Sequence, residues 1–142
     1  MTANLEKAKE ILALGGYTCA LCKGEEVYTS TKRGVLPLVV WLENNADFHG
    51  FSVADKVVGK GAAFLYLLLG VDAVYAHVIS KPAFALLQQH GIEVEYDEKT
   101  EHIINRKGDG FCPFELAVMG IDDAKIAYFA IRKKLQEMNV TF

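Results

Sequence analysis

The stretch Ser52–Gly70, SVADKVVGKGAAFLYLLLG, decides how the rest of the chain is organised. We interpret it as one long helix, in which Ser52 and Asp55 form a Ser-x-x-acid start and Gly70 supplies a left-handed stop. Its second half, Ala62–Leu69, is apolar on all sides, which is typical of a helix packed between a sheet and another layer. The stretch therefore predicts a central, buried helix.

Two glycines interrupt the first half of this stretch. Gly59 and Gly61 each disfavour a helix by about 1 kcal/mol relative to alanine. A glycine at such a position is favoured where another group approaches the backbone closely. We therefore expect either a packed strand or a ligand beside these two residues.

The composition is typical of one globular domain. The chain has 142 residues, of which 51% are apolar, enough for one sizeable core and too few for a second folding unit. Eighteen acidic residues against fifteen basic ones give a formal charge of −3, which argues against a nucleic-acid partner. The run Ala62–Leu69 is too short to span a membrane, and the N-terminus lacks a signal pattern. We expect residues 1–142 to form a single cytoplasmic domain without a membrane partner.

The segments on both sides of the central helix alternate between helical and extended patterns. Before it, the sequence predicts a helix that ends at Gly15-Gly16 and hairpin strands at 17–21 and 27–31 around a turn at 23–26. Residues 35–44 are either a short buried helix with Pro37 in its first turn, which we favour, or a third strand. After it come strands at 73–79 and 92–96, a helix from Pro82 to His90 between them, a polar turn at 97–100, and helices starting at Pro113 and Asp122-Asp123. This order predicts a three-layer α/β/α domain with a mixed central sheet.

Three further stretches resemble a known family. They are VVGKGAAFLYLLLGV at 57–71, VISKPAFALLQQHGIEVEY at 78–96 and INRKGDGFCPFELAV at 104–118. Together they resemble the small bacterial DUF1893 family, an uncharacterised branch of the cytidine deaminase-like fold. The resemblance implies that fold for residues 1–142, and it implies no reaction because the family has none assigned.

The resemblance also points to where a metal site would lie. Cytidine deaminase-like enzymes hold zinc at two helix starts, one with His-x-Glu and one with Pro-Cys-x-x-Cys. At the matching positions this chain has Asp55-Lys56-Val57 and Pro82-Ala83-Phe84-Ala85, which offer neither His nor Cys. A catalytic zinc needs three protein ligands and an open position for water. We therefore expect a zinc-free protein without a cofactor, and no zinc-dependent deamination.

The remaining cysteines do not predict a replacement metal site. Cys19 and Cys22 form a C-x-x-C, but an offset of three on a strand points the two side chains to opposite faces, so we interpret both as core thiols. The four histidines have no mutual spacing that resembles a zinc site.

Lysines at the start of the central helix are candidates for anion binding. Lys56 and Lys60 lie four residues apart and would share a helix face, where the dipole and free amides also favour anions. The alternative is a solvated flank beside Asp55. Ser80 and Lys81 follow an interior strand at its carboxyl end, where open α/β sheets have ligand crevices. The alternative for Ser80 is a simple helix cap.

Cys112 is a candidate nucleophile. It stands at a helix start before Pro113, where the dipole favours the thiolate, and Glu115 one turn later is a candidate base. The alternative is that both residues only complete a helix cap. The preceding loop adds Asn105, Arg106 and Asp109, and Arg106 suits a bidentate oxyanion contact unless it is merely solvated.

Three functions remain open from the sequence. The first is binding of a small anionic, nucleotide-like or phosphorylated ligand by Asp55, Lys56, Lys60, Ser80, Asn105, Arg106 and Asp109. The second is a metal-free enzyme for acyl or sulfur transfer, with Cys112 as nucleophile and Glu115 or Asp109 assisting. The third is a homo-oligomeric interaction module that uses residues 35–44 or an edge strand.

Overall fold

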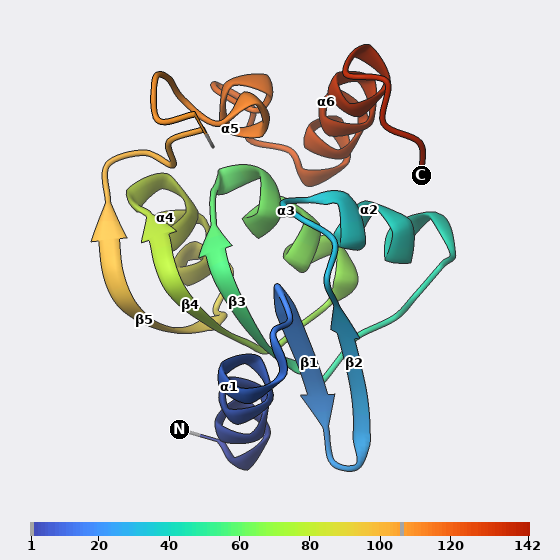
Figure 1. The fold of residues 1–142 in the computed structure, drawn as a ribbon, viewed down its shortest axis with the longest axis vertical. Helices are drawn as coiled ribbons and strands as arrows, with labels where there is room; N and C mark the ends of the chain where they lie inside the picture. Colours follow the sequence, from blue (N-terminus) through green and yellow to red (C-terminus); the bar gives the residue numbers. More distant parts are fainter. Residues whose placement is uncertain (1, 106) are drawn as a thin grey trace.

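The structure is a computed structural model that describes residues 2–105 and 107–142. Within these residues the chain forms five strands and six helices (Figure 1). The strands are β1 (Cys19–Lys23), β2 (Glu26–Ser30), β3 (Ser52–Val58), β4 (Ala73–Ser80) and β5 (Glu93–Thr100). The helices are α1 (Ala3–Gly15), α2 (Leu36–Glu43), α3 (Lys60–Leu69), α4 (Lys81–Gln89), α5 (Pro113–Ala117) and α6 (Ala124–Glu137). The predicted α/β class and mixed sheet are confirmed.

The sheet combines an antiparallel hairpin with a parallel half. Its strand order is β2-β1-β3-β4-β5. β1 pairs antiparallel with β2 and β3, whereas β3, β4 and β5 run parallel to one another. The carboxyl ends of the parallel strands therefore meet at one edge, the upper edge in Figure 1, and α5 lies beyond it. Open α/β sheets have their ligand sites at this kind of edge.

Helices cover the two faces of the sheet unequally. On one face α1 packs Leu5, Ala8 and Leu12 against a small cluster that includes Ala54 and Tyr75. On the other face α2, α3 and α4 form the main core with the sheet, and α6 packs outside α3. Helix α3 is thus covered on both sides, as its apolar sequence predicts.

The prediction of one helix over Ser52–Gly70 is wrong in its first half. Residues 52–58 form β3, which pairs with β1 on one side and β4 on the other, and α3 begins only at Lys60. The β-branched valines of this segment suit a strand, and Gly59 has extended backbone (φ −95°, ψ 177°) as the helix N-cap. Because Ser52 and Asp55 are strand residues, they form no helix-capping pair. The stop at Gly70 is confirmed, with φ 86°.

The predicted polar turn at 97–100 is also wrong. Strand β5 continues to Thr100 and keeps its register with β4 as far as the pair Ser80 and Thr100. Its charged residues stand on an edge strand, where exposed charges protect the edge from pairing with another chain. The polarity of residues 97–100 therefore reflects their position on an edge strand of the sheet and does not indicate a turn.

The other predicted elements lie close to where the pattern puts them. Helix α1 is capped by the Thr2 hydroxyl, and Gly16 ends it with φ 70°. The hairpin, α2, β4, α4 and α6 are found with boundaries shifted by a few residues at most. Among the described residues, none of the helices combines the length and apolar character needed to cross a membrane.

Candidate functional site

A carboxylate from α5 accepts a hydrogen bond from the first turn of α3. Glu115 is only 7% exposed, and its Oε1 accepts a hydrogen bond from the Lys60 backbone N–H at 3.3 Å. A Cβ at Gly59 would stand 2.7 Å from that oxygen, and a Cβ at Gly61 would stand 3.4 Å from the Phe114 carbonyl oxygen. Ile103 Cγ1 would also stand 3.2 Å from the Cβ at Gly59, and Ile131 Cδ1 of α6 would stand 3.4 Å from the Cβ at Gly61. The two glycines are thus approached by side chains and backbone of α5, α6 and the segment after β5, whereas the sequence led us to expect a strand or a ligand.

His102 lies beside this carboxylate. It follows the end of β5, and its Nδ1 is 4.0 Å from Glu115 Oε2. Its ring also lies against Phe111, with ring centroids 4.6 Å apart. Sequence reasoning missed this residue, although its position just after a parallel strand was a usable signal.

A cleft of about 530 Å³ opens between the first turns of α3 and the length of α4, from Pro82 to the C-cap residue His90. It is lined by Lys60, Phe64, Pro82, Ala85, Leu86, Gln89, His90, Ile121 and Asp122. The Lys60 ammonium lies 5.6 Å from the centre of the Phe64 ring. His90 Nδ1 is 3.0 Å from the Leu86 carbonyl oxygen, which can only accept, so Nδ1 donates and Nε2 is left as an acceptor in the neutral ring.

The predicted lysine pair does not share a helix face. Lys60 lines the cleft, but Lys56 is an exposed residue of β3. Asp55, its neighbour, points to α3, and successive strand residues point to opposite faces, so Lys56 points to the other side of the sheet. The prediction of a shared face failed because it assumed a helix at residues 52–58.

Ser80 and Lys81 are both engaged within the chain. Ser80 is fully buried, and its hydroxyl accepts a hydrogen bond from Ala83 N at 3.3 Å as the N-cap of α4. The Lys81 ammonium donates to the Glu101 carboxylate. The helix-cap interpretation of Ser80 is therefore confirmed.

Asp55 lies in the core, in contact with α3. The Tyr66 hydroxyl donates to its Oδ2 at 2.6 Å, and Val57 N donates to its Oδ1 at 3.3 Å. Burial raises the Asp55 pKa to about 6, although these hydrogen bonds act in the opposite direction. Cys19 lies directly across from it on β1, and burial together with the nearby Asp55 charge raises the pKa of its thiol. Asp55, Tyr66 and Cys19 form a buried polar cluster that is separate from the cleft lining.

The loop before α5 is held by its own side chains. Asn105 Nδ2 donates to Asp109 Oδ1 at 2.9 Å, and Asp109 N donates to Asn105 Oδ1 at 3.2 Å. The predicted anion contact of Arg106 lies outside the described residues. These hydrogen bonds close an exposed turn, and a ligand-binding role for Asn105 and Asp109 stays a prediction.

Cys112 is the N-cap residue of α5, as predicted. It is half-buried, and its side chain makes no capping hydrogen bond. The helix that follows has only five residues, so its dipole is small and favours a thiolate at Cys112 only weakly. The contacts that the structure gives Glu115 are with Lys60 and His102. A catalytic pair of Cys112 and Glu115 therefore stays a prediction.

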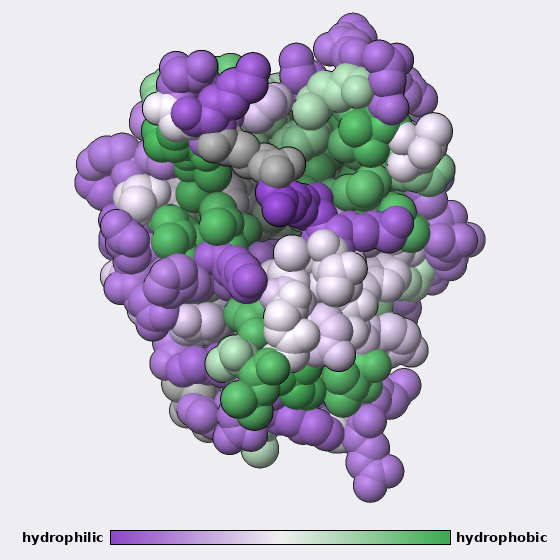
Figure 2. Space-filling model, in the orientation of Figure 1, coloured by the Kyte–Doolittle hydropathy of each residue, from purple (hydrophilic) through white to green (hydrophobic). Residues whose placement is uncertain are grey.

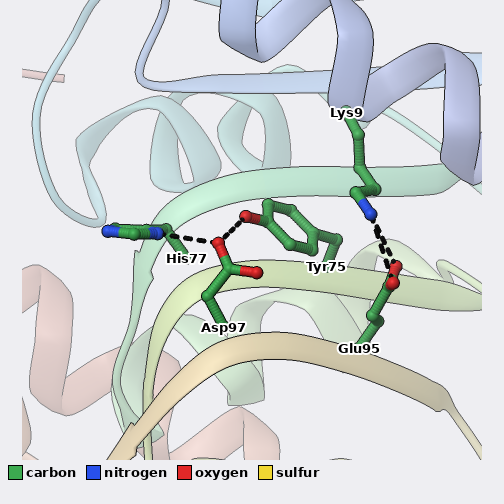
Figure 3. A network of polar contacts seen from close by, with 5 residues as sticks. All are labelled: Lys9, Tyr75, His77, Glu95 and Asp97. Atoms are coloured by element: carbon green, nitrogen blue, oxygen red, sulfur yellow. Dashed lines mark hydrogen bonds and ion pairs between the residues drawn. The ribbon is translucent and has the colours of Figure 1, made fainter.

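A polar network lies on the face of the sheet that α1 covers in part (Figure 3). Asp97 accepts hydrogen bonds from the Tyr75 hydroxyl and from His77, whose Nδ1 is 2.8 Å away. These bonds lower the Asp97 pKa, while burial and the Asp97 contact raise the pKa of Tyr75 to about 12. Lys9 of α1 binds Glu95 at 3.1 Å. Tyr75 and His77 on β4, like Glu95 and Asp97 on β5, lie two residues apart and therefore on the same face of the sheet. This spacing was the signal in the sequence for the network.

The same face is open to solvent toward the carboxyl ends of the parallel strands. Lys56 of β3 and His77 of β4 are exposed there. Figure 2 shows hydrophilic and apolar atoms mixed on this side of the molecule, over the strands that lie at the left in Figure 1. The network joins β4 to β5 and α1, on the opposite face of the sheet from the cleft. Within residues 2–105 and 107–142, no three His, Cys, Asp or Glu side chains gather closely enough to hold a metal ion.

Comparisons with known proteins agree on one family. The family model described as a domain of unknown function (DUF1893) matches residues 7–135. A crystal structure of a DUF1893 family protein (TM1506) from Thermotoga maritima is similar to this chain, with 31% identity and a TM-score of 0.86 over 94% of this chain and 92% of that one. No curated protein matches the chain. A match over this length, to the family and to a solved member alike, establishes that the chain belongs to the DUF1893 family.

Proposed function

We propose that this DUF1893 protein binds a small anionic ligand, nucleotide-like or phosphorylated, in the cleft between α3 and α4. The observation that carries the proposal is that Lys60 and Pro82, at the starts of two neighbouring helices, line one cavity of about 530 Å³. Small-molecule sites have volumes of roughly 300–1,000 Å³ and few polar groups among apolar walls. The volume of the cleft lies in this range, and its lining combines five apolar residues with Lys60, Gln89, His90 and Asp122.

The cleft lining suggests how such a ligand lies. Phe64, Leu86 and Ile121 provide apolar walls that suit a planar base or the apolar side of a sugar. Lys60 supplies the charge for a phosphate or carboxylate. Gln89 and the free Nε2 of His90 offer hydrogen bonds to a base or a hydroxyl group. These groups favour a ligand with one anionic end and one ring.

We also propose that the domain has the cytidine deaminase-like fold. The sheet order and the Pro82 helix that follows β4 support this assignment. Residues 55–57 belong to β3, so the positions that correspond to His-x-Glu are Lys60-Gly61-Ala62 at the start of α3. A lysine at the first of these positions favours an anion where the enzymes hold a cation. The free thiols of Cys19, Cys22 and Cys112 support a cytoplasmic location.

The test compares two lysine variants against a panel of anions. Thermal unfolding is measured with nucleoside monophosphates, ribose 5-phosphate and uncharged nucleosides. A ligand at 100 times its dissociation constant adds about 2.7 kcal/mol to the stability. We expect a phosphorylated compound to raise the melting temperature of the wild type and of Lys56→Ala, but not of Lys60→Ala.

Lys56→Ala is the matched control because it removes an equal charge from the other face of the sheet. If both variants lose the response equally, the effect is nonspecific charge attraction, and the proposed site is wrong. If no phosphorylated compound at millimolar concentration shifts the wild type, the proposed ligand class is wrong.

A further inference from the structure

Strand β2 leaves one edge of the sheet open to pairing (Figure 1). It is the last strand on its side, and its residues Val27 and Tyr28 are 39% and 43% exposed. The opposite edge strand, β5, has four acidic residues among its eight, whereas β2 has one, Glu26, among its five. Charged side chains on an edge strand prevent it from pairing with another chain. The edge at β5 is protected in this way and the edge at β2 is not.

The turn of the hairpin determines which main-chain groups β2 presents at this edge. Lys23 and Glu26 pair on either side of the two-residue turn Gly24-Glu25, whose glycine has φ 59°. In such a hairpin the pair that closes the turn is hydrogen-bonded, so the N–H and C=O groups of every second residue from Glu26 onward point to β1. The residues between them, whose main-chain groups point away from the sheet, are Val27, Thr29 and Thr31.

The extended chain continues beyond the last residue of β2. The Thr18 hydroxyl lies 3.0 Å from the Ser30 carbonyl oxygen and 2.6 Å from the Lys32 carbonyl oxygen. Two carbonyl groups that are two residues apart therefore point to the same side, as they do along a strand. The carbonyl group of Thr31, between them, points outward. The edge that can pair with another strand thus runs from Glu26 to Lys32.

Charges of opposite sign stand at the two ends of this edge. Glu25 and Glu26 lie at its start, Lys32 and Arg33 lie at its end, and all four are exposed. Within residues 2–105 and 107–142, none of the ion pairs involves any of them. Residues 27–31, between the two ends, are uncharged. An antiparallel copy of the same edge would therefore present its basic end to this acidic end.

One antiparallel register brings these charges together. Because outward main-chain groups must face outward ones, the two-fold axis passes through a residue and not between two residues. With the axis at Thr29, Glu26 faces Lys32 of the second copy. The same register brings Glu25 near Arg33 of the second copy. An axis one residue earlier or later would leave both acids without a base, and a parallel pair would place like charges opposite each other, which destabilises a sheet.

We propose that the protein forms a two-fold dimer in which β2 pairs antiparallel with β2 of a second copy, with the axis at Thr29. The sheets of the two copies then join into one continuous sheet, as in other complexes that add a strand to an edge. The outward main-chain groups gain hydrogen-bond partners, and neighbouring strands cover part of Val27 and Tyr28. The residues that line the α3–α4 cleft lie on α3, α4 and the segment before α6, so the dimer is independent of whether that cleft binds a ligand.

Helix α1 orders the hairpin for this contact. Asn4 Oδ1 accepts a hydrogen bond from the Gly24 N–H at 3.0 Å, and the Lys7 ammonium donates to the Gly24 carbonyl oxygen at 3.0 Å. Both contacts fix the turn between β1 and β2 against the helix. An edge that is already ordered loses little conformational entropy when it pairs, which favours association.

The first test is the molar mass in solution, measured by sedimentation equilibrium. We expect the wild type to be a dimer at micromolar concentration. Thr29→Pro removes the outward N–H at the axis and leaves the hydrogen bonds between β2 and β1 in place, so it should raise the dissociation constant at least ~100-fold. Circular dichroism verifies that this variant is folded.

The second test exchanges the charges that define the register. Glu26→Lys and Lys32→Glu each place like charges opposite each other twice in a homodimer, so each should raise the dissociation constant about 10-fold. In a mixture of the two variants the lysines of one chain face the glutamates of the other, so a heterodimer should form with an affinity close to that of the wild type. Glu93→Lys is the matched control, because it reverses an exposed acid on the other edge strand, β5, and should leave the dimer unchanged.

Each measurement can also overturn the proposal. A wild type that stays monomeric at roughly 100 μM is not a specific dimer. A dimer that survives Thr29→Pro uses another surface. If the mixture of Glu26→Lys and Lys32→Glu associates no better than either variant alone, the two edges do not pair in the proposed register.

Discussion

Asp55 is a carboxyl group that is only 8% exposed. Its Tyr66 hydrogen bond and its position opposite Cys19 hold it inside the main core. Burial of a carboxyl group disfavours its charged form, and its pKa is about 6. Protonated, Asp55 costs little to bury. Ionised, it destabilises the fold relative to the unfolded chain, in which the pKa of an aspartate is about 3.9.

We predict that Asp55 makes the protein less stable as the pH rises. A carboxyl group whose folded pKa is raised contributes full stability below the unfolded pKa, and the contribution is lost as the pH rises through the folded pKa. Between pH 4 and pH 7 the free energy of unfolding of the wild type should fall, relative to Asp55→Asn, by on the order of 2 kcal/mol. Urea unfolding of both proteins over this pH range measures the difference.

Asp97→Asn is the control, because the Asp97 pKa is shifted in the opposite direction from that of Asp55. The hydrogen bonds from Tyr75 and His77 lower the Asp97 pKa, so its contribution is present above the unfolded pKa and is lost as the pH falls through the folded pKa. This variant should differ from the wild type in its pH dependence only below about pH 4. Equal pH slopes for Asp55→Asn and the wild type would contradict the account of Asp55.

At the scale of elements, the contact of Glu115 of α5 with the start of α3 disfavours any side chain at position 59. An alanine there has no backbone strain, since φ is −95°, but its Cβ would stand 2.7 Å from Glu115 Oε1. Glu115 would have to leave the Lys60 N–H. Hydrogen bonds to charged groups contribute about 1.5–3 kcal/mol. A buried carboxylate therefore takes the place of a side-chain cap on α3.

We predict that Gly59→Ala and Glu115→Ala are strongly coupled. Gly59→Ala alone should lower the free energy of unfolding by about 1–3 kcal/mol. In the Glu115→Ala background the same change should cost much less, because only the 3.2 Å approach of the Cβ to Ile103 Cγ1 remains and alanine restricts the unfolded chain. A double-mutant cycle in urea measures the coupling.

Gly110→Ala is the matched control for this cycle. Its Cβ would meet only Asn105 Nδ2 at 3.5 Å, so the change should be close to neutral with or without Glu115. Additive effects of Gly59→Ala and Glu115→Ala would mean that Glu115 does not define position 59.

The segment 52–70 shows how far local patterns reach. Its second half is a helix, as the all-apolar run predicts, and Gly70 ends it. Its first half matches a helix-capping motif, yet it lies between two strands in the sheet. Tertiary pairing overrides such weak local preferences. The glycine at 59 was the boundary signal, and its cause, Glu115, lies more than 50 residues away in the sequence.

The candidate site could be predicted only where local sequence patterns determine the structure. Pro82 marks a helix start that the sequence predicts, whereas Lys60 was chosen within a helix expected to begin at Ser52, and its place at the true start of α3 was not predicted. The prediction that Lys56 binds the ligand assumed the same helix. Because residues 52–58 form β3, Lys56 lies on the other face of the sheet. Ile121 and Asp122 reach the cleft from the link between α5 and α6, and no local pattern predicts such a contact.

At the scale of the whole molecule, the two faces of the sheet have cores of different size. α1 alone covers its part of one face, through Leu5, Ala8 and Leu12, with a hydrogen bond from Lys7 to the Gly24 carbonyl and an ion pair from Lys9 to Glu95. The other face is covered by α2, α3 and α4, with α6 outside α3. Regions with few buried apolar contacts open at a lower free energy than the main core. We expect α1 to detach while the main core stays folded.

Two leucine variants test whether α1 opens before the main core unfolds. The measurement is hydrogen exchange of backbone amides under native conditions. Leu5 and Leu65 are both fully buried, one in each core, and alanine at either should cost about 2–5 kcal/mol. Leu5→Ala should lower the opening free energy of α1 and of α3 alike, because α1 is unfolded in both open states. Leu65→Ala should lower that of α3 and leave that of α1 unchanged, since α1 opens with α3 still packed. If Leu65→Ala instead lowers the protection of α1 by as much as that of α3, the two faces unfold as one unit, and the independent opening of α1 is refuted.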